Sequence, residues 1–113
     1  MISSTTPELV SFIAGVNAKK EAYRVATGLT VYSSLFVEVY NVGPKYIKLI
    51  SVETHAASGT KAFGSLYAFI DRETGDIYKP ASAKAPAKGV RGNLFASDNG
   101  LTRCGQYGPA YNN

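Results

Sequence analysis

The residues best suited to chemistry are four basic side chains in a stretch without acidic residues. Residues 77–97 contain no Asp or Glu, and the positive charges there fall on Lys79, Lys84, Lys88 and Arg91. Ammonium and guanidinium groups both suit phosphate oxygens. On an extended backbone of about 3.3 Å per residue these groups would recur roughly every 10 to 17 Å. We therefore predict that they follow the phosphates of a single-stranded nucleic acid.

Aromatic residues supply the second half of such a site. The chain has eight tyrosines and five phenylalanines, and Tyr67, Phe69 and Tyr78 lie on predicted strands next to the basic stretch. Exposed rings on a sheet stack on unpaired bases of any kind, so these three residues are the predicted stacking platform. The alternative is that the rings pack in the core or across strands, where tyrosine is common.

The charge distribution agrees with an anionic partner. The formal net charge is +4. Residues 1–76 carry seven basic and seven acidic residues, whereas residues 77–113 carry five basic residues and one acidic residue. All of the surplus therefore lies in the last third of the chain, which favours binding of a polyanion there.

Catalysis and metal binding find little support in the residue types. His55 is the only histidine and Cys104 the only cysteine, which excludes a histidine-rich metal site and an intramolecular disulfide. A Cys104–His55 nucleophile pair, or a metal site at Asp71, Glu73 and Asp76, is the competing interpretation. The three carboxylates bracket a glycine turn, where acidic residues are typical of turn geometry. We expect no enzyme activity, no cofactor and no metal.

The sequence also bears on location. No apolar stretch approaches the roughly 18 to 20 residues that cross a bilayer, and the N-terminus lacks the basic and apolar regions of a signal peptide. A lone cysteine suits a reducing compartment. We predict a cytoplasmic protein without a membrane partner.

The N-terminal segment predicts an amphipathic helix from about Pro7 to at least Ala18. Residues 5–8, Thr-Thr-Pro-Glu, have the spacing of a capping box with proline in the first turn. Lys20 on the apolar face weakens an extension toward Thr27 and a stop at Gly28. Apolar residues follow the cap at helical spacing: Leu9, Phe12, Ile13 and Val16.

Four β-like stretches follow the helix, and their pattern predicts an α+β fold. Their residue ranges are 33–42, 46–54, 63–71 and 76–79. Pro80 ends the fourth stretch because it lacks the N–H that a paired strand needs. The predicted architecture is a helix packed on a four-stranded antiparallel meander. Both sheet faces are partly apolar, so the helix covers one face and something else covers or uses the other.

The remainder, residues 80–113, predicts a long irregular segment, basic and rich in glycine and proline. We treat residues 1–113 as one domain, with residues 1–79 as its body. A structureless segment of this length is unusual in a small domain unless it is functional. Val90, Leu94 and Phe95 are apolar, so residues 80–95 are expected to lie against the sheet.

The segment from Gly75 to Asn93 resembles a group of small phage and viral-metagenome proteins. The shared pattern is GD(I/V)xKPAS, then a lysine-rich APAK element, then RGN, and often a YGxAY ending, here Tyr107 to Tyr111. Many of those proteins have an aromatic residue where this chain has Ala83, so stacking by that position is not expected here. The resemblance implies a viral origin, host cytoplasm as the location and a role with viral nucleic acid.

Two hypotheses follow. The leading one is a protein that binds single-stranded DNA or RNA with weak sequence preference, with a slope of about 3 in log affinity against log salt if four cations each neutralise one phosphate. The rival is a protein-interaction module, such as a minor virion component, scaffold or inhibitor of a host factor. In the rival, the C-terminal segment is an arm anchored by Phe95, Tyr107 and Tyr111. A homo-oligomer is compatible with both.

Overall fold

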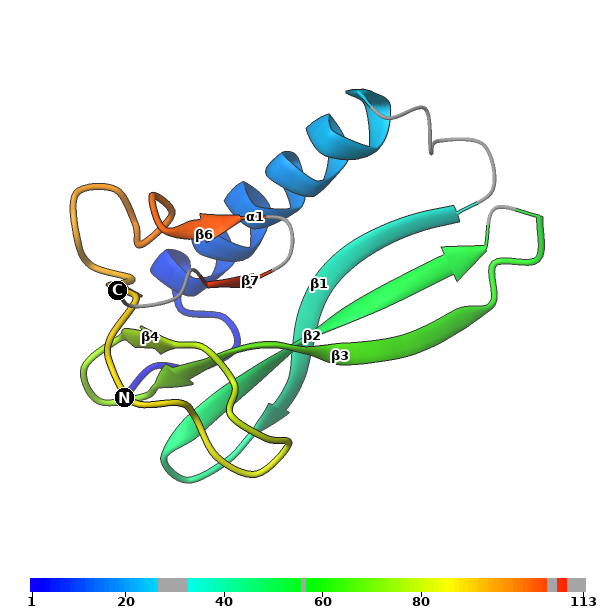
Figure 1. The fold of residues 1–113 in the computed structure, drawn as a ribbon. Coiled ribbons are helices and arrows are strands. Elements are labelled where there is room, and N and C mark those ends of the chain that lie inside the picture. The colour runs from blue at the N-terminus through cyan, green and yellow to red at the C-terminus, as the bar shows by residue number, and fades with distance from the viewer. Residues whose placement is uncertain (27–32, 56, 106–107, 110–113) are drawn as a thin grey trace.

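The protein is an α+β fold of one helix and a five-stranded antiparallel sheet, shown by the computed structural model in Figure 1. The structure describes residues 1–26, 33–55, 57–105 and 108–109. The helix is α1 (Pro7–Ala26). The sheet follows chain order: β1 (Ser33–Val42), β2 (Tyr46–His55), β3 (Lys61–Asp71), β4 (Asp76–Tyr78) and β5 (Gly92–Asn93). A separate two-stranded sheet pairs β6 (Cys104–Gly105) with β7 (Gly108–Pro109).

The predicted class is confirmed, but the predicted strand count is short by one. The first four strands form the expected meander, and β4 ends before Pro80 as the missing N–H requires. The fifth strand is only two residues long, and it pairs Gly92 with Ile77 and Asn93 with Asp76. Two residues are too few to show a periodicity, which explains why the sequence pattern did not reveal this strand.

The helix begins at Pro7 as predicted, but Thr6 rather than Thr5 precedes it as the N-cap. The Thr6 carbonyl accepts the N–H groups of Leu9 and Val10, at 3.0 Å each. The helix continues past Lys20, whose Nζ lies 5.6 Å from the centroid of the Tyr67 ring. A cation over an aromatic face is stabilised there, so this lysine can be buried on the apolar side. Gly28, the predicted stop, lies outside the described residues.

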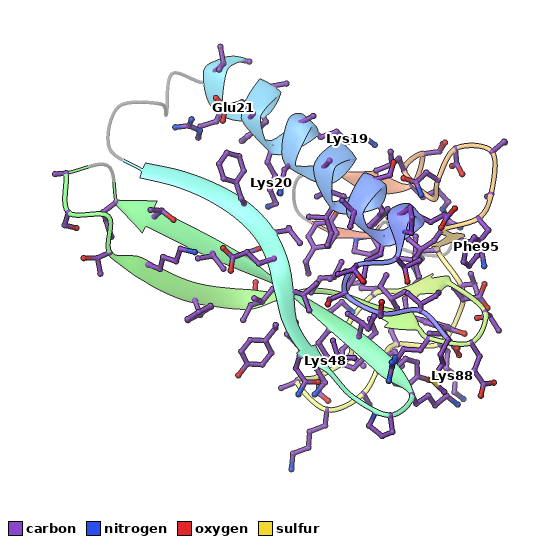
Figure 2. All side chains as sticks on the ribbon, turned by 180° about the vertical axis from the view of Figure 1, so that it is seen from behind. Lys19, Lys20, Glu21, Lys48, Lys88 and Phe95 are labelled. Atoms are coloured by element: carbon purple, nitrogen blue, oxygen red, sulfur yellow. The ribbon has the colours of Figure 1, made fainter. Side chains whose placement is uncertain are left out.

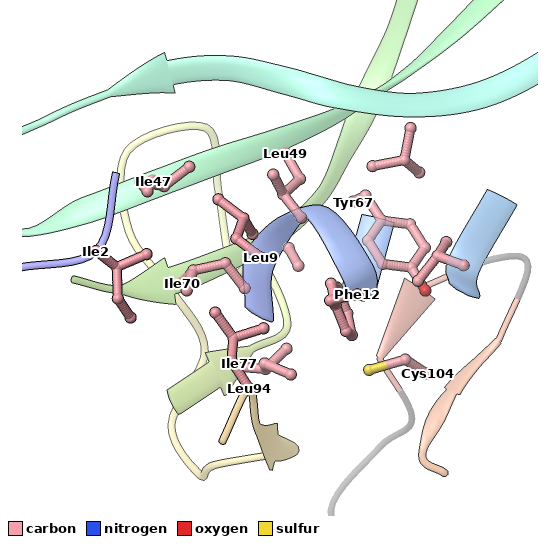
Figure 3. Close-up of a cluster of buried hydrophobic side chains, with 13 residues drawn as sticks. Ile2, Leu9, Phe12, Ile47, Leu49, Tyr67, Ile70, Ile77, Leu94 and Cys104 are labelled. Atoms are coloured by element: carbon pink, nitrogen blue, oxygen red, sulfur yellow. The ribbon is translucent and has the colours of Figure 1, made fainter. Parts of the chain in front are cut away.

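The core lies between α1 and one face of the sheet (Figure 3). The helix contributes Leu9, Phe12 and Val16, and β2 contributes Ile47 and Leu49, all fully buried. The core is completed by residues from the N-terminus, the other strands and the C-terminal segment: Ile2, Val37, Tyr67, Ala68, Ile70, Ile77, Leu94 and Cys104.

The C-terminal segment is largely irregular, yet some of its described residues pack in or against the core. Lys19 Nζ donates to the carbonyls of Leu101 and Cys104, the latter at 2.8 Å. A Cβ at Gly15 would lie 2.6 Å from Leu101 Cδ1, so the Leu101 side chain packs directly on the helix backbone at this glycine. Leu94, Leu101 and Cys104 of the predicted arm therefore pack on the body of the same chain, whereas Phe95, one of its predicted anchors, is 54% exposed. Tyr107 and Tyr111, the other predicted anchors, lie outside the described residues.

Candidate nucleic-acid interface

The sheet face away from α1, called the open face, carries its own pattern of side chains. Because neighbouring strand residues point to opposite faces, Lys48, Ile50 and Val52 face away from the core residues Ile47 and Leu49. Figure 1 shows α1 on one side of the sheet and the loop after β4 on the other. This separation of helix and loop agrees with the expectation that something other than the helix covers or uses the second face.

Two exposed aromatic rings lie on the open face. Tyr40 of β1 is 56% exposed and Phe63 of β3 is 63% exposed. Their ring centroids are 6.3 Å apart and their planes are tilted by 59°. Phe63 is held in place by cross-strand pairing with Val52, which pairs in turn with Phe36. The rings thus reach toward each other over β2 from the two strands that flank it.

A β-bulge places Tyr40 at this position. Val39 pairs with Leu49 and Asn41 pairs with Lys48, which leaves Tyr40 as the extra residue of β1. Bulges commonly re-aim a side chain. The sequence put Tyr40 on the face with Phe36 and Glu38 but gave no reason to prefer it over the other tyrosines. No spacing or composition in the sequence distinguishes it from them.

A groove of about 580 Å³ is lined by Tyr40 and by Gly64, the residue after Phe63, but not by Phe63 itself. Ile50 and Tyr40 line it from the sheet, and residues 64–67 of β3 line it along the strand edge. Lys79 to Ala83 line it from the loop after β4, together with Gly108 and Pro109. A site of this size, with an apolar floor and few polar groups, is typical of small-ligand or single-nucleotide binding.

The predicted basic stretch forms a folded loop, residues 79–91, which we call the basic loop. Pro80 and Pro86 form an antiparallel bridge, and Ala87 N–H donates to the Lys79 carbonyl at 2.7 Å. The chain therefore doubles back on itself, with Lys84 near the turn. The prediction of an extended backbone with charges every 10 to 17 Å is wrong, because these internal hydrogen bonds hold the two halves of the loop together.

Of the three lysines of the basic loop, only Lys79 lines the groove. Lys79 is half-buried, whereas Lys84 and Lys88 are exposed. Neither Lys84 nor Lys88 forms an ion pair with the described carboxylates. Lys48 joins them from β2, because its Nζ donates to the Ala83 carbonyl at 2.7 Å. Figure 2 shows Lys48 and Lys88 at the end of the molecule away from Lys20.

Arg91 is not part of this surface, so its prediction as a phosphate ligand is wrong. It is only 5% exposed, and its Nη1 donates to the carbonyls of Lys88 and Gly89 at 3.1 and 2.7 Å. The guanidinium instead ties down the end of the basic loop. Its Nε is buried without a partner among the described residues.

The predicted stacking platform is wrong for Tyr67 and Phe69, which are 2% and 0% exposed. The Tyr67 hydroxyl donates to the Gly105 carbonyl at 2.6 Å, and burial raises the pKa of this hydroxyl. The Phe69 ring lies edge-on to Tyr46 with centroids 5.7 Å apart. Both rings are packing residues, as the alternative interpretation held, and neither has a free face for a base.

Tyr78 is half-buried and also packs against Tyr46, with ring centroids 6.2 Å apart. Burial raises the pKa of Tyr78, and Asp76 adds to the shift. Tyr78 stays at the border of the open face, but its ring is engaged by a neighbour. The exposed pair, Tyr40 and Phe63, is therefore the better stacking surface.

Comparison with known proteins adds a family to this description. The model of a family of unknown function (DUF7717) matches residues 11–111. The chain belongs to this family. No curated protein and no solved structure matches the chain. The matched range includes every groove residue of the DUF7717 chain described above, as well as the whole basic loop.

Other chemical groups of the DUF7717 chain have structural partners. Asp71 Oδ1 accepts the N–H groups of Glu73 and Thr74, at 2.8 and 3.2 Å, and so organises the β3–β4 turn. The buried Cys104 thiol has its pKa raised to about 11, mainly by burial, so it is protonated at neutral pH. In the described part of the chain no three His, Cys, Asp or Glu residues cluster as metal ligands would.

Within the described residues no helix is both long enough and apolar enough to cross a bilayer.

Proposed function

We propose that this protein binds single-stranded nucleic acid, DNA or RNA, at the groove of the open face. The observation that supports this most is the exposed Tyr40–Phe63 pair beside a groove whose opposite wall is the acid-free basic loop. Stacking on aromatic rings and attraction to lysines are the two contributions on which sequence-tolerant single-strand binding depends. A duplex hides its bases from such rings, so single strands are the favoured form.

The electrostatic contribution to binding is smaller than the four predicted cations would give. With Arg91 buried, Lys79, Lys84 and Lys88 remain on the basic loop. Three neutralised phosphates on a single strand correspond to a slope of about 2 in log affinity against log salt. Glu38, the cross-strand partner of the groove residue Ile50, forms an ion pair with Lys61 at 3.0 Å. This ion pair reduces the repulsion that Glu38 would exert on a phosphate.

The test is binding of labelled oligonucleotides, followed by fluorescence anisotropy at several salt concentrations. Phe63→Leu should weaken binding by about 1–3 kcal/mol, the range for one stacked base, which is roughly 5- to 150-fold. Phe95→Leu is the matched control, because Phe95 is similarly exposed at 54% but lines a separate hollow with Pro7, Glu8 and Ser11 at the start of α1. Absence of binding at low salt would remove the proposal, as would equal losses in both variants.

A further inference from the structure

We infer that the groove selects strands whose neighbouring bases are not stacked on each other, and therefore pyrimidine-rich over purine-rich strands. This inference rests on the proposed function, and it names the class of strand that the same site takes. It is carried by the relative placement of the Tyr40 and Phe63 rings.

The two rings cannot receive two bases that remain stacked. Their centroids are 6.3 Å apart, whereas successive nucleotides in a stacked helical strand rise by about 3.4 Å. The ring planes are also tilted by 59°. Two neighbouring bases, each lying flat on one ring, would be tilted relative to each other by a similar angle. They would then have lost their contact with one another.

The sheet fixes the positions from which the two rings project. Tyr40 and Phe63 come from β1 and β3, on opposite sides of β2, so the spacing of their Cα atoms is set by the sheet. Phe63 pairs with Val52, whose side chain is 2% exposed.

Hydrogen-bond readout of the bases is limited in this groove. Apart from Tyr40, the described lining side chains with polar groups are Ser65, Tyr67, Lys79 and Ser82. The Tyr67 hydroxyl already donates to the Gly105 carbonyl. Base identity therefore acts mainly through the free energy of unstacking the free strand. Purine runs stack more strongly on themselves than pyrimidine runs, so they lose more when they bind.

The experiment compares labelled oligo(dT) and oligo(dA) of about 15 nucleotides, a length within known single-strand site sizes, at one low salt concentration. We expect oligo(dT) to bind at least five-fold more tightly to the wild-type protein. Phe63→Leu should weaken oligo(dT) binding and bring the ratio toward one, whereas Phe95→Leu should change neither. Circular dichroism verifies that both variants are folded.

A second readout follows base stacking directly. A strand that carries 2-aminopurine beside adenine should become brighter on binding, because this fluorophore is quenched by stacked neighbours. Equal affinity for both strands, a preference for oligo(dA), an unchanged ratio in Phe63→Leu, or no brightening would overturn the inference and leave the proposed function standing. Failure of the wild-type protein to bind either strand would overturn both.

Discussion

Replacing Arg91 with methionine should destabilise the fold while leaving the salt dependence of nucleic-acid binding unchanged. The guanidinium is 5% exposed and donates two hydrogen bonds from Nη1 to main-chain carbonyls. Hydrogen bonds to charged groups contribute about 1.5–3 kcal/mol each. Burying a guanidinium whose Nε lacks a described partner offsets part of this gain.

We therefore expect a net loss of about 1–3 kcal/mol, because the two carbonyls lose their donor while the methionine chain keeps the apolar contacts. For a domain near 100 residues, each kcal/mol lowers Tm by about 4–8 °C. Thermal unfolding followed by circular dichroism measures this loss, and anisotropy against salt measures the slope. A variant with the wild-type Tm and a slope flatter by about 0.7 would place Arg91 on the phosphate and refute the assignment made here.

The remaining predictions concern charge, backbone and pH. Lys84→Gln and Lys88→Gln should each flatten the salt slope by about 0.7 with no change in Tm; an unchanged slope would remove that lysine from the interface. Gly100→Ala should lower the free energy of unfolding, measured in urea, by at least about 2 kcal/mol. The reasons are that φ of Gly100 is 78° and that the added Cβ would lie 2.3 Å from Ile77 Cδ1. Wild-type stability in this variant would contradict the prediction. The free energy of unfolding should fall as pH rises above 9. Burial raises the pKa of Cys104 from 9.0 to about 11, so in this pH range the folded state keeps a proton that the unfolded chain releases. Cys104→Ala should lessen this fall in pH-dependent urea unfolding, and an equally steep fall would exclude the thiol as its source.

The fold was predictable where local chemistry decides it. Proline at the first helical position, with apolar residues at helical spacing behind it, set the start of α1 at Pro7. The stop of β4 followed from the missing N–H of Pro80. The end of the helix was harder to predict from the sequence. A lysine such as Lys20 is unfavourable on an apolar helix face unless an aromatic ring lies beneath its ammonium group. That ring belongs to Tyr67, far along the chain, and no local pattern shows it.

The candidate site was predictable in composition but not in geometry. The basic loop and an aromatic sheet were expected, yet the wrong rings were chosen. The alternation of β3 could not show that four successive residues, Tyr67 to Ile70, would all be buried. They are buried because α1 covers one face, while Tyr46, Lys48 and the basic loop lie on the other. Arg91 was predicted to face solvent, but its partners are carbonyl groups of its own loop. The sequence does not show where main-chain carbonyls point.

Pro80 connects the fold to the candidate site, because the early end of β4 leaves room for the groove. Among the described strands, β4 pairs with β3 only at Phe69 and Ile70. The β3 edge from Lys61 to Ala68 therefore has no neighbouring strand of the main sheet on its outer side in the described residues. The basic loop, which turns away after Pro80, becomes the opposite wall instead of a longer fourth strand. A substitution that let β4 extend along β3 would fill the groove with main chain, and nucleic-acid binding should be lost while the fold remains.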